Sequence, residues 1–155
     1  MLLVFVLGFV SCAVLIFSSN FNLEIPFKTG WVVFDGTIVG PSDYIGEDDI
    51  VILSDRVILR IGDTTLSSYA DSGSMLPVLD EGANGIRVVP ASESEIEVGD
   101  IVSFRMFGML VVHRVVDKGV DGDGVYFITK GDSNLVSDGK IRFKDIEYVT
   151  IGVLY

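Results

Sequence analysis

The stretch IVSFRMFGMLVVHRVV, residues 101–116, decides the fold class of this chain. It consists of two runs rich in β-branched and aromatic residues on either side of Phe107-Gly108. Two such runs that flank a short glycine-containing turn are typical of an antiparallel β-hairpin. Because successive side chains of a strand point to opposite faces, the second run places His113 on one face and Arg114 on the other.

Similar short runs recur along the chain, separated by turn signals such as Ser54-Asp55 and the DGDG stretch at 121–124. Short strands with regular turn signals are typical of antiparallel sandwiches and barrels. The sequence therefore predicts a mainly β fold, either an antiparallel β-sandwich or an open barrel. The expected strands are 31–39, 50–53, 57–61, 85–89, 101–107, 110–116, 125–130 and 146–154.

Residues 1–17, MLLVFVLGFVSCAVLIF, contain no charged side chain, and the first charge in the chain is Glu24. As a helix this run would reach about 26 Å, and extension to residue 23 would span the ~30 Å core of a bilayer. A buried core helix is disfavoured because the run has no polar face. A cleaved signal peptide is disfavoured because no basic residue precedes the run and no clear small-x-small site follows it. We therefore expect one transmembrane helix as an anchor at 1–23 and a β-rich domain at 24–155.

The chain carries 11 Lys and Arg against 22 Asp and Glu, a formal net charge of −11. Such a domain is repelled by phosphate backbones and its basic residues are scattered, so no nucleic-acid partner is expected. The single cysteine, Cys12, excludes an intramolecular disulfide and a cysteine-based metal site. The acidic residues at 47–49 and the pair Asp121 and Asp123 lack the spacing of a calcium-binding loop, and we interpret both as turns or solvated loops.

Three segments carry side chains that could act together in catalysis. The only histidine, His113, lies in an apolar run, where it needs a partner and could serve with a carboxylate as a general base. The segment DSGSMLPVL at 71–79 contains Ser74 between a glycine and a methionine, a setting that could hold a hydroxyl rigidly. A third segment supplies Asp132 and Asp138, either of which could orient the histidine. Taken singly, these are more typical of a loop serine, a structural histidine and turn aspartates.

Together, the segments resemble the type I signal peptidases of the archaeal and endoplasmic-reticulum kind. The order matches that family: an N-terminal apolar segment, then SGSMLP, VGDIVSF, VVHRVV and TKGDSN. The resemblance is strong over about residues 70–139 and includes the position of the anchor. Each motif alone is weak, whereas five in order at family-like spacing are specific.

The resemblance implies a role for each matching residue. Ser74 would be the nucleophile, and His113 stands where bacterial relatives have a catalytic lysine. Asp138, six residues after Asp132, resembles the third member of the triad, and Asp132 resembles a supporting residue. Ser72 matches the position whose hydroxyl joins the Ser74 amide in the oxyanion hole.

The sequence departs from the family pattern at two positions near these residues. Ser133 replaces an asparagine of the family's GDNN motif, and Leu76 stands where many relatives have a glutamate. Neither departure removes a group to which the resemblance assigns a catalytic role.

The implied function is a membrane-bound serine endopeptidase, with 24–155 as the peptidase domain, that cleaves signal peptides from secreted preproteins after small residues. It needs no cofactor and no metal. Its expected partners are preprotein signal peptides and the lipid bilayer, and a need for accessory subunits stays open. The expected location is the cell membrane, single-pass, with the catalytic domain extracytoplasmic. Two alternatives remain: a non-catalytic membrane-anchored β module that binds extracytoplasmic proteins, and a self-cleaving repressor-type peptidase with a Ser-Lys dyad.

Overall fold

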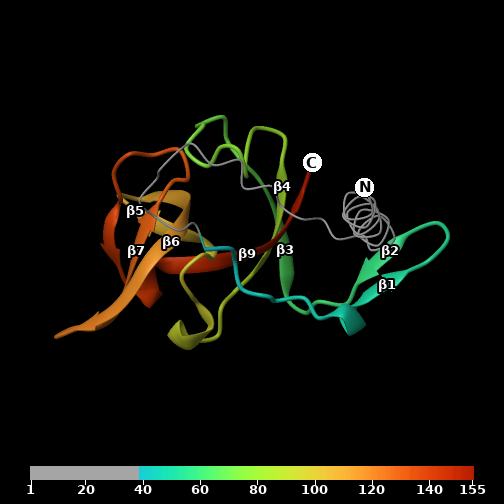
Figure 1. Cartoon of the computed structure of the whole chain (residues 1–155), viewed down its shortest axis with the longest axis horizontal. Helices are drawn as coiled ribbons and strands as arrows, with labels where there is room; N and C mark the ends of the chain where they lie inside the picture. Colours follow the sequence, from blue (N-terminus) through green and yellow to red (C-terminus); the bar gives the residue numbers. More distant parts are fainter. Residues whose placement is uncertain (1–38) are drawn as a thin grey trace, which may run out of the picture. The chain divides into compact units, whose positions relative to one another are not determined.

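The computed structural model describes residues 39–155 (Figure 1). The expected anchor at 1–23 lies outside the described residues, as does nearly all of the expected strand 31–39. Between residues 39 and 155, the only helical elements are single 3-10 turns, and none of them could cross a membrane.

The described part of the chain is mainly β, and every strand pairing in it is antiparallel. Seven strands form one sheet in the order β3-β4-β9-β5-β6-β7-β8, and β1 and β2 form a separate two-stranded sheet. The larger sheet is open, because β3 and β8 are its two edges. The strands are β1 (Ile50–Ile52), β2 (Val57–Leu59), β3 (Thr64–Ser68), β4 (Asn84–Val88), β5 (Ile101–Met106), β6 (Met109–Asp121), β7 (Gly124–Lys130), β8 (Gly139–Ile141) and β9 (Ile146–Leu154), and the 3-10 turns are η1 (Glu47–Asp49), η2 (Glu93–Glu95) and η3 (Phe143–Asp145).

The hairpin predicted from residues 101–116 is confirmed as β5 and β6. Phe104 lies opposite Val111 in the register of the two strands. The turn residues Phe107 and Gly108 have φ angles of 51° and 81°, and two consecutive left-handed residues give the turn a twist that matches the flanking strands. The hairpin thereby places His113 on β6 opposite a fully buried residue of β5.

Two apolar clusters lie on opposite faces of β5. Phe104 belongs to the larger cluster, together with Phe127 and other fully buried side chains. Ile101 belongs to a smaller cluster with Met75 and Leu79. Because residues 101 and 104 differ in parity along the strand, the segment that contains Met75 packs on the face that the main core leaves free. The backbone of that segment is therefore held against the sheet by buried side chains.

Two strands were not predicted from the sequence. β3 reads TTLSS and β8 reads GKI, so neither shows an apolar alternation long enough to be recognised. Both are edge strands, which need less apolar surface than central strands because one side is open to water. β6 also continues beyond the expected residue 116 to Asp121, with a register shift between Val115 and Asp117.

Replacement of Phe127 tests the main core. Its side chain has no exposed surface, so Phe127→Ala removes packing on all sides and should lower the free energy of unfolding by about 3–5 kcal/mol. Phe107→Ala is the matched control, because that side chain is 93% exposed and its loss should change stability by less than about 0.5 kcal/mol. Urea titration followed by circular dichroism measures both values, and equal losses in the two variants would contradict this description of the core.

Candidate active site

His113 on β6 is mostly buried and faces a carboxylate. Its Nδ1 lies 2.6 Å from Oδ2 of Asp138, and Thr129 Oγ1 donates to the same oxygen at 2.9 Å. An ionised carboxylate only accepts hydrogen bonds, so the short contact places the imidazole proton on Nδ1. In the neutral imidazole this contact leaves the lone pair on Nε2, which is the arrangement that a general base requires.

Asp138 is itself fixed by the strand that precedes its loop. Its backbone N–H donates to the Thr129 carbonyl at 2.8 Å, so one residue of β7 holds both the backbone and the carboxylate. Thr129 is fully buried and belongs to the TKGDSN motif, but its role was not predicted from the sequence. A threonine near the end of the strand that precedes a loop with two aspartates was the signal that could have identified it.

Ser74 lies in a tight turn beside a second serine. The hydroxyl oxygens of Ser72 and Ser74 are 3.1 Å apart, and the Ser74 amide donates to the Ser72 hydroxyl at 3.4 Å. Between them Gly73 has a φ of 64°, a left-handed conformation that favours glycine. The turn thus brings the Ser72 hydroxyl within hydrogen-bond distance of both the hydroxyl and the amide of Ser74.

Ser74 and His113 line the same cavity, which has a volume of about 400 Å³. Among the described residues no hydrogen bond joins these two side chains, and catalytic contacts of this type commonly tighten when substrate binds. The lining combines hydroxyl-bearing side chains with aliphatic ones. The lining residues are Ser67, Ser68, Tyr69, Ala70, Ser72, Ser74, Met75, Leu79, Leu110, Val111, Val112 and His113.

The hydroxyl of Tyr69 is the titratable group of the cavity wall besides His113. Burial raises its pKa above the ordinary value, while a hydrogen bond with Thr150 and the charge of Arg87 act in the opposite direction. The side chain is therefore neutral at physiological pH and adds no charge to the cavity. Within residues 39–155, no three His, Cys, Asp or Glu side chains converge in an arrangement that could hold a metal ion.

Asp132 serves a different partner from Asp138. Arg114 donates to both of its carboxylate oxygens, from Nε and Nη2, each at 2.8 Å. The remaining Nη1 of Arg114 donates to the Gly99 carbonyl at 2.7 Å. Both side chains of the pair are more than nine-tenths buried. Asp132 therefore holds its loop onto β6, whereas Asp138 contacts the histidine.

The loop that begins at Gly131 supports the Ser74 turn directly. The Ser133 N–H donates to the Ser74 carbonyl at 2.9 Å, and the Ser133 hydroxyl donates to the Leu76 carbonyl at 2.8 Å. A side chain on Gly131 would place its Cβ 2.6 Å from the Ser74 carbonyl, so only glycine fits there. Ser133 departs from the family's GDNN motif, and its contact with the Ser74 turn was not predicted from the sequence.

The structure thus places the five predicted residues around one site. His113 and Asp138 are in contact, and Ser72 and Ser74 are in contact. The two serines line the same cavity as His113, and Asp132 contacts Arg114, the neighbour of His113 on β6.

Parts of the chain are similar to two signal peptidases. It is 35% identical over 68 residues to signal peptidase I W of Bacillus subtilis (strain 168), a match that covers 43% of this chain and 36% of the relative. It is 35% identical over 80 residues to SEC11, the catalytic subunit of the signal peptidase complex of Scheffersomyces stipitis, with 50% and 47% covered.

The chain spans less than half the length of the curated relatives it matches. No family model and no solved structure matches the chain. The two similarities support a relationship to the signal peptidase I family, and they do not distinguish between its branches.

Removal of Asp132 tests the structural role of its ion pair. Asp132→Ala leaves the buried guanidinium of Arg114 without a counter-charge and should lower the free energy of unfolding by about 3–5 kcal/mol. Asp43→Ala removes an exposed aspartate and should change it by less than about 0.5 kcal/mol. Chemical denaturation of the two variants provides the comparison, and a loss below 1 kcal/mol in Asp132→Ala would count against the supporting role.

Proposed function

We propose that this protein is a membrane-anchored serine endopeptidase that removes signal peptides from secreted preproteins. The observation that carries the proposal is the 2.6 Å contact between His113 Nδ1 and Asp138 Oδ2 beside the cavity that Ser74 lines. A histidine oriented by a carboxylate, with a hydroxyl on the same cavity, is the constellation that recurs in serine proteases of unrelated folds. The similarity to two signal peptidases supplies the substrate class.

The chemistry follows from the proposed roles. Ser74 Oγ attacks the scissile carbonyl carbon while His113 Nε2 accepts its proton, and Asp138 stabilises the imidazolium that forms. The Ser74 amide and the Ser72 hydroxyl stabilise the negative charge on the carbonyl oxygen. Collapse of this intermediate transfers the proton to the leaving amine and leaves an acyl-enzyme at Ser74. Water then attacks the ester, His113 accepts a proton from it, and Ser74 regains its hydroxyl as the carboxylate product leaves.

The substrate would bind in an extended conformation beside β3. This strand is an edge of the seven-stranded sheet, so its outer backbone groups can pair with an added strand. Ser67 and Ser68 at its end line the cavity, so a peptide paired there reaches the nucleophile. The aliphatic lining residues, which include Leu79 and Leu110, suit the small side chains expected before the cut.

The anchor completes the proposal, although it lies outside the described residues. A single span at 1–23 would place the peptidase domain at the extracytoplasmic surface of the cell membrane, where cleavage sites of preproteins emerge. The bilayer and the preproteins are then the partners that the function requires.

Replacement of the nucleophile and the base tests the proposal. Ser74→Ala and His113→Ala should each reduce cleavage of a preprotein by at least about 10³-fold, because neither residue works without the other. Ser94→Ala, which removes an exposed hydroxyl on η2, should cleave at the wild-type rate. Processing is followed by gel shift of a preprotein incubated with the full chain in liposomes. Near-normal processing by either of the first two variants would exclude the assignment.

The orienting aspartate has a separate test. Asp138→Asn keeps the shape of the side chain but favours the wrong histidine tautomer, and should lower kcat by about 10⁴-fold. Asp132→Asn should lower stability with a smaller effect on the kcat of the folded fraction. Rates are normalised to the folded fraction measured by circular dichroism. The assignment is wrong in its third member if folded Asp132→Asn is inactive while Asp138→Asn remains active.

A further inference from the structure

The hairpin of β1 and β2 exposes an aliphatic face of four side chains. Ile50 lies opposite Leu59, and Ile52 lies opposite Val57, so all four point to the same face. They are between 36% and 77% exposed, with Ile52 the most exposed. No charged residue belongs to either strand, and four contiguous aliphatic side chains in water are typical of a binding surface.

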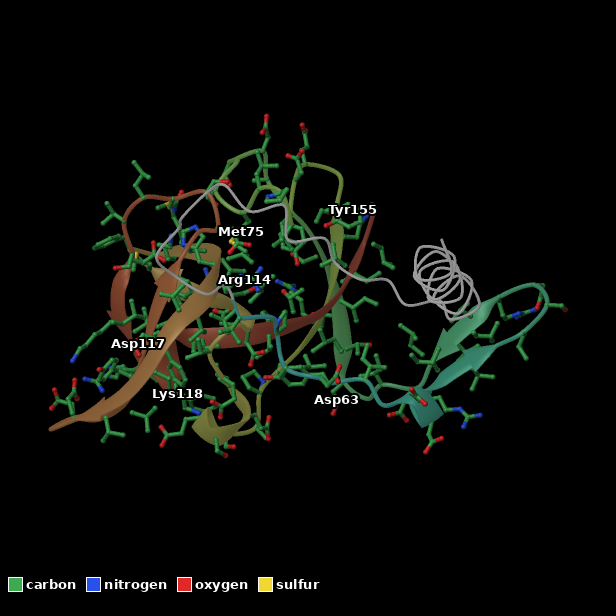
Figure 2. The ribbon with its side chains drawn as sticks, viewed as in Figure 1. Asp63, Met75, Arg114, Asp117, Lys118 and Tyr155 are labelled. Carbon is green, nitrogen blue, oxygen red and sulfur yellow. The ribbon has the colours of Figure 1, made fainter. Side chains whose placement is uncertain are left out.

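The position of the hairpin relates it to the proposed active site. Residues 60–63 connect its second strand to β3, and the hairpin projects from that end of β3 (Figure 1). The other end of β3 carries Ser67 and Ser68, which line the cavity. Asp63 accordingly lies far from Met75 and Arg114 (Figure 2). A chain paired along β3 would run about 14 Å along the strand, and the aliphatic face begins beyond residues 60–63 at its far end.

Charged residues flank the aliphatic face at both ends. η1 places three acidic residues at its base, where the described residues include one basic neighbour, Arg60, and Asp55 and Arg56 form an exposed ion pair at its tip. Charges at the tip disfavour insertion into a bilayer, because moving them into hydrocarbon is costly. The acidic base also disfavours anionic headgroups and favours a ligand with positive charge.

We propose that the aliphatic face binds the apolar segment of the signal peptide whose cleavage site lies in the cavity, which rests on the proposed function. A signal peptide consists of a basic start, 7–15 apolar residues and a small-residue cleavage site. The domain offers complementary features: the cavity, the aliphatic face beyond the far end of β3, and acidic residues beside that face. An apolar segment of this length reaches about 10–22 Å as a helix and more when extended, which covers the path along β3.

A binding measurement tests the proposal without relying on turnover. In the Ser74→Ala background, the full chain in phosphatidylcholine nanodiscs is titrated against a fluorescent peptide that contains a whole signal sequence, and against a short peptide with the cleavage site alone. The double variant Ile52→Ser and Val57→Ser should raise the Kd of the long peptide about tenfold, which equals the loss of about 1.4 kcal/mol. The Kd of the short peptide should stay within twofold. Val120→Ser is the control, because it removes a side chain that is 73% exposed on another hairpin.

Three outcomes would overturn the proposal. An unchanged Kd for the long peptide means that the aliphatic face does not contact it. An equal rise for both peptides means that the substitutions distort the cavity. A rise in the Kd of the long peptide that Val120→Ser reproduces means that the effect is not specific to the aliphatic face. Failure of the proposed function is recognised separately, because wild type would then leave both peptides uncleaved while their binding could still be compared.

Discussion

The buried ion pair of Arg114 and Asp132 fixes the loop on which the whole candidate site depends. Arg114 uses three nitrogens, two for the carboxylate and one for the Gly99 carbonyl, and this planar fork allows little freedom of orientation. The loop held in this way supports the Ser74 turn through Ser133 and carries Asp138 to the histidine. A pair of this kind contributes little net stability, but loss of one partner is costly, so it enforces one arrangement of the loop.

Strand alternation explains how one loop serves both functions. His113 and Arg114 are neighbours on β6, so their side chains leave the strand on opposite faces. Each meets an aspartate of the same loop, and Asp132 and Asp138 are separated by six residues. On one face of β6, Arg114 pairs with Asp132 and holds the loop in place. On the other face, His113 contacts Asp138, which orients the imidazole.

The parts of the fold that could be predicted are those in which the local pattern of apolar and turn residues matches the burial of the strands. The β5–β6 hairpin combines apolar alternation with a glycine turn, and both features follow from residues close together in the chain. β3 and β8 escaped prediction because an edge strand needs few apolar residues, and their pairing is decided by neighbours distant in sequence. Contacts between residues distant in sequence also limited what could be predicted about the site. The family resemblance indicated His113 and Asp138, whereas the contacts of Ser133 depend on a tertiary approach that no local pattern encodes.

Catalysis and recognition make opposite demands on the surface of this domain. The contact of His113 with Asp138 benefits from burial, because water does not compete there for the hydrogen bond. Binding of an apolar segment requires side chains that remain in water until the ligand arrives, since their removal from water drives association. A hairpin outside the seven-stranded sheet satisfies this second demand without opening the core. Under the proposed function, changes in Ile52 or Val57 would therefore alter which substrates bind and leave the contact between His113 and Asp138 as it is.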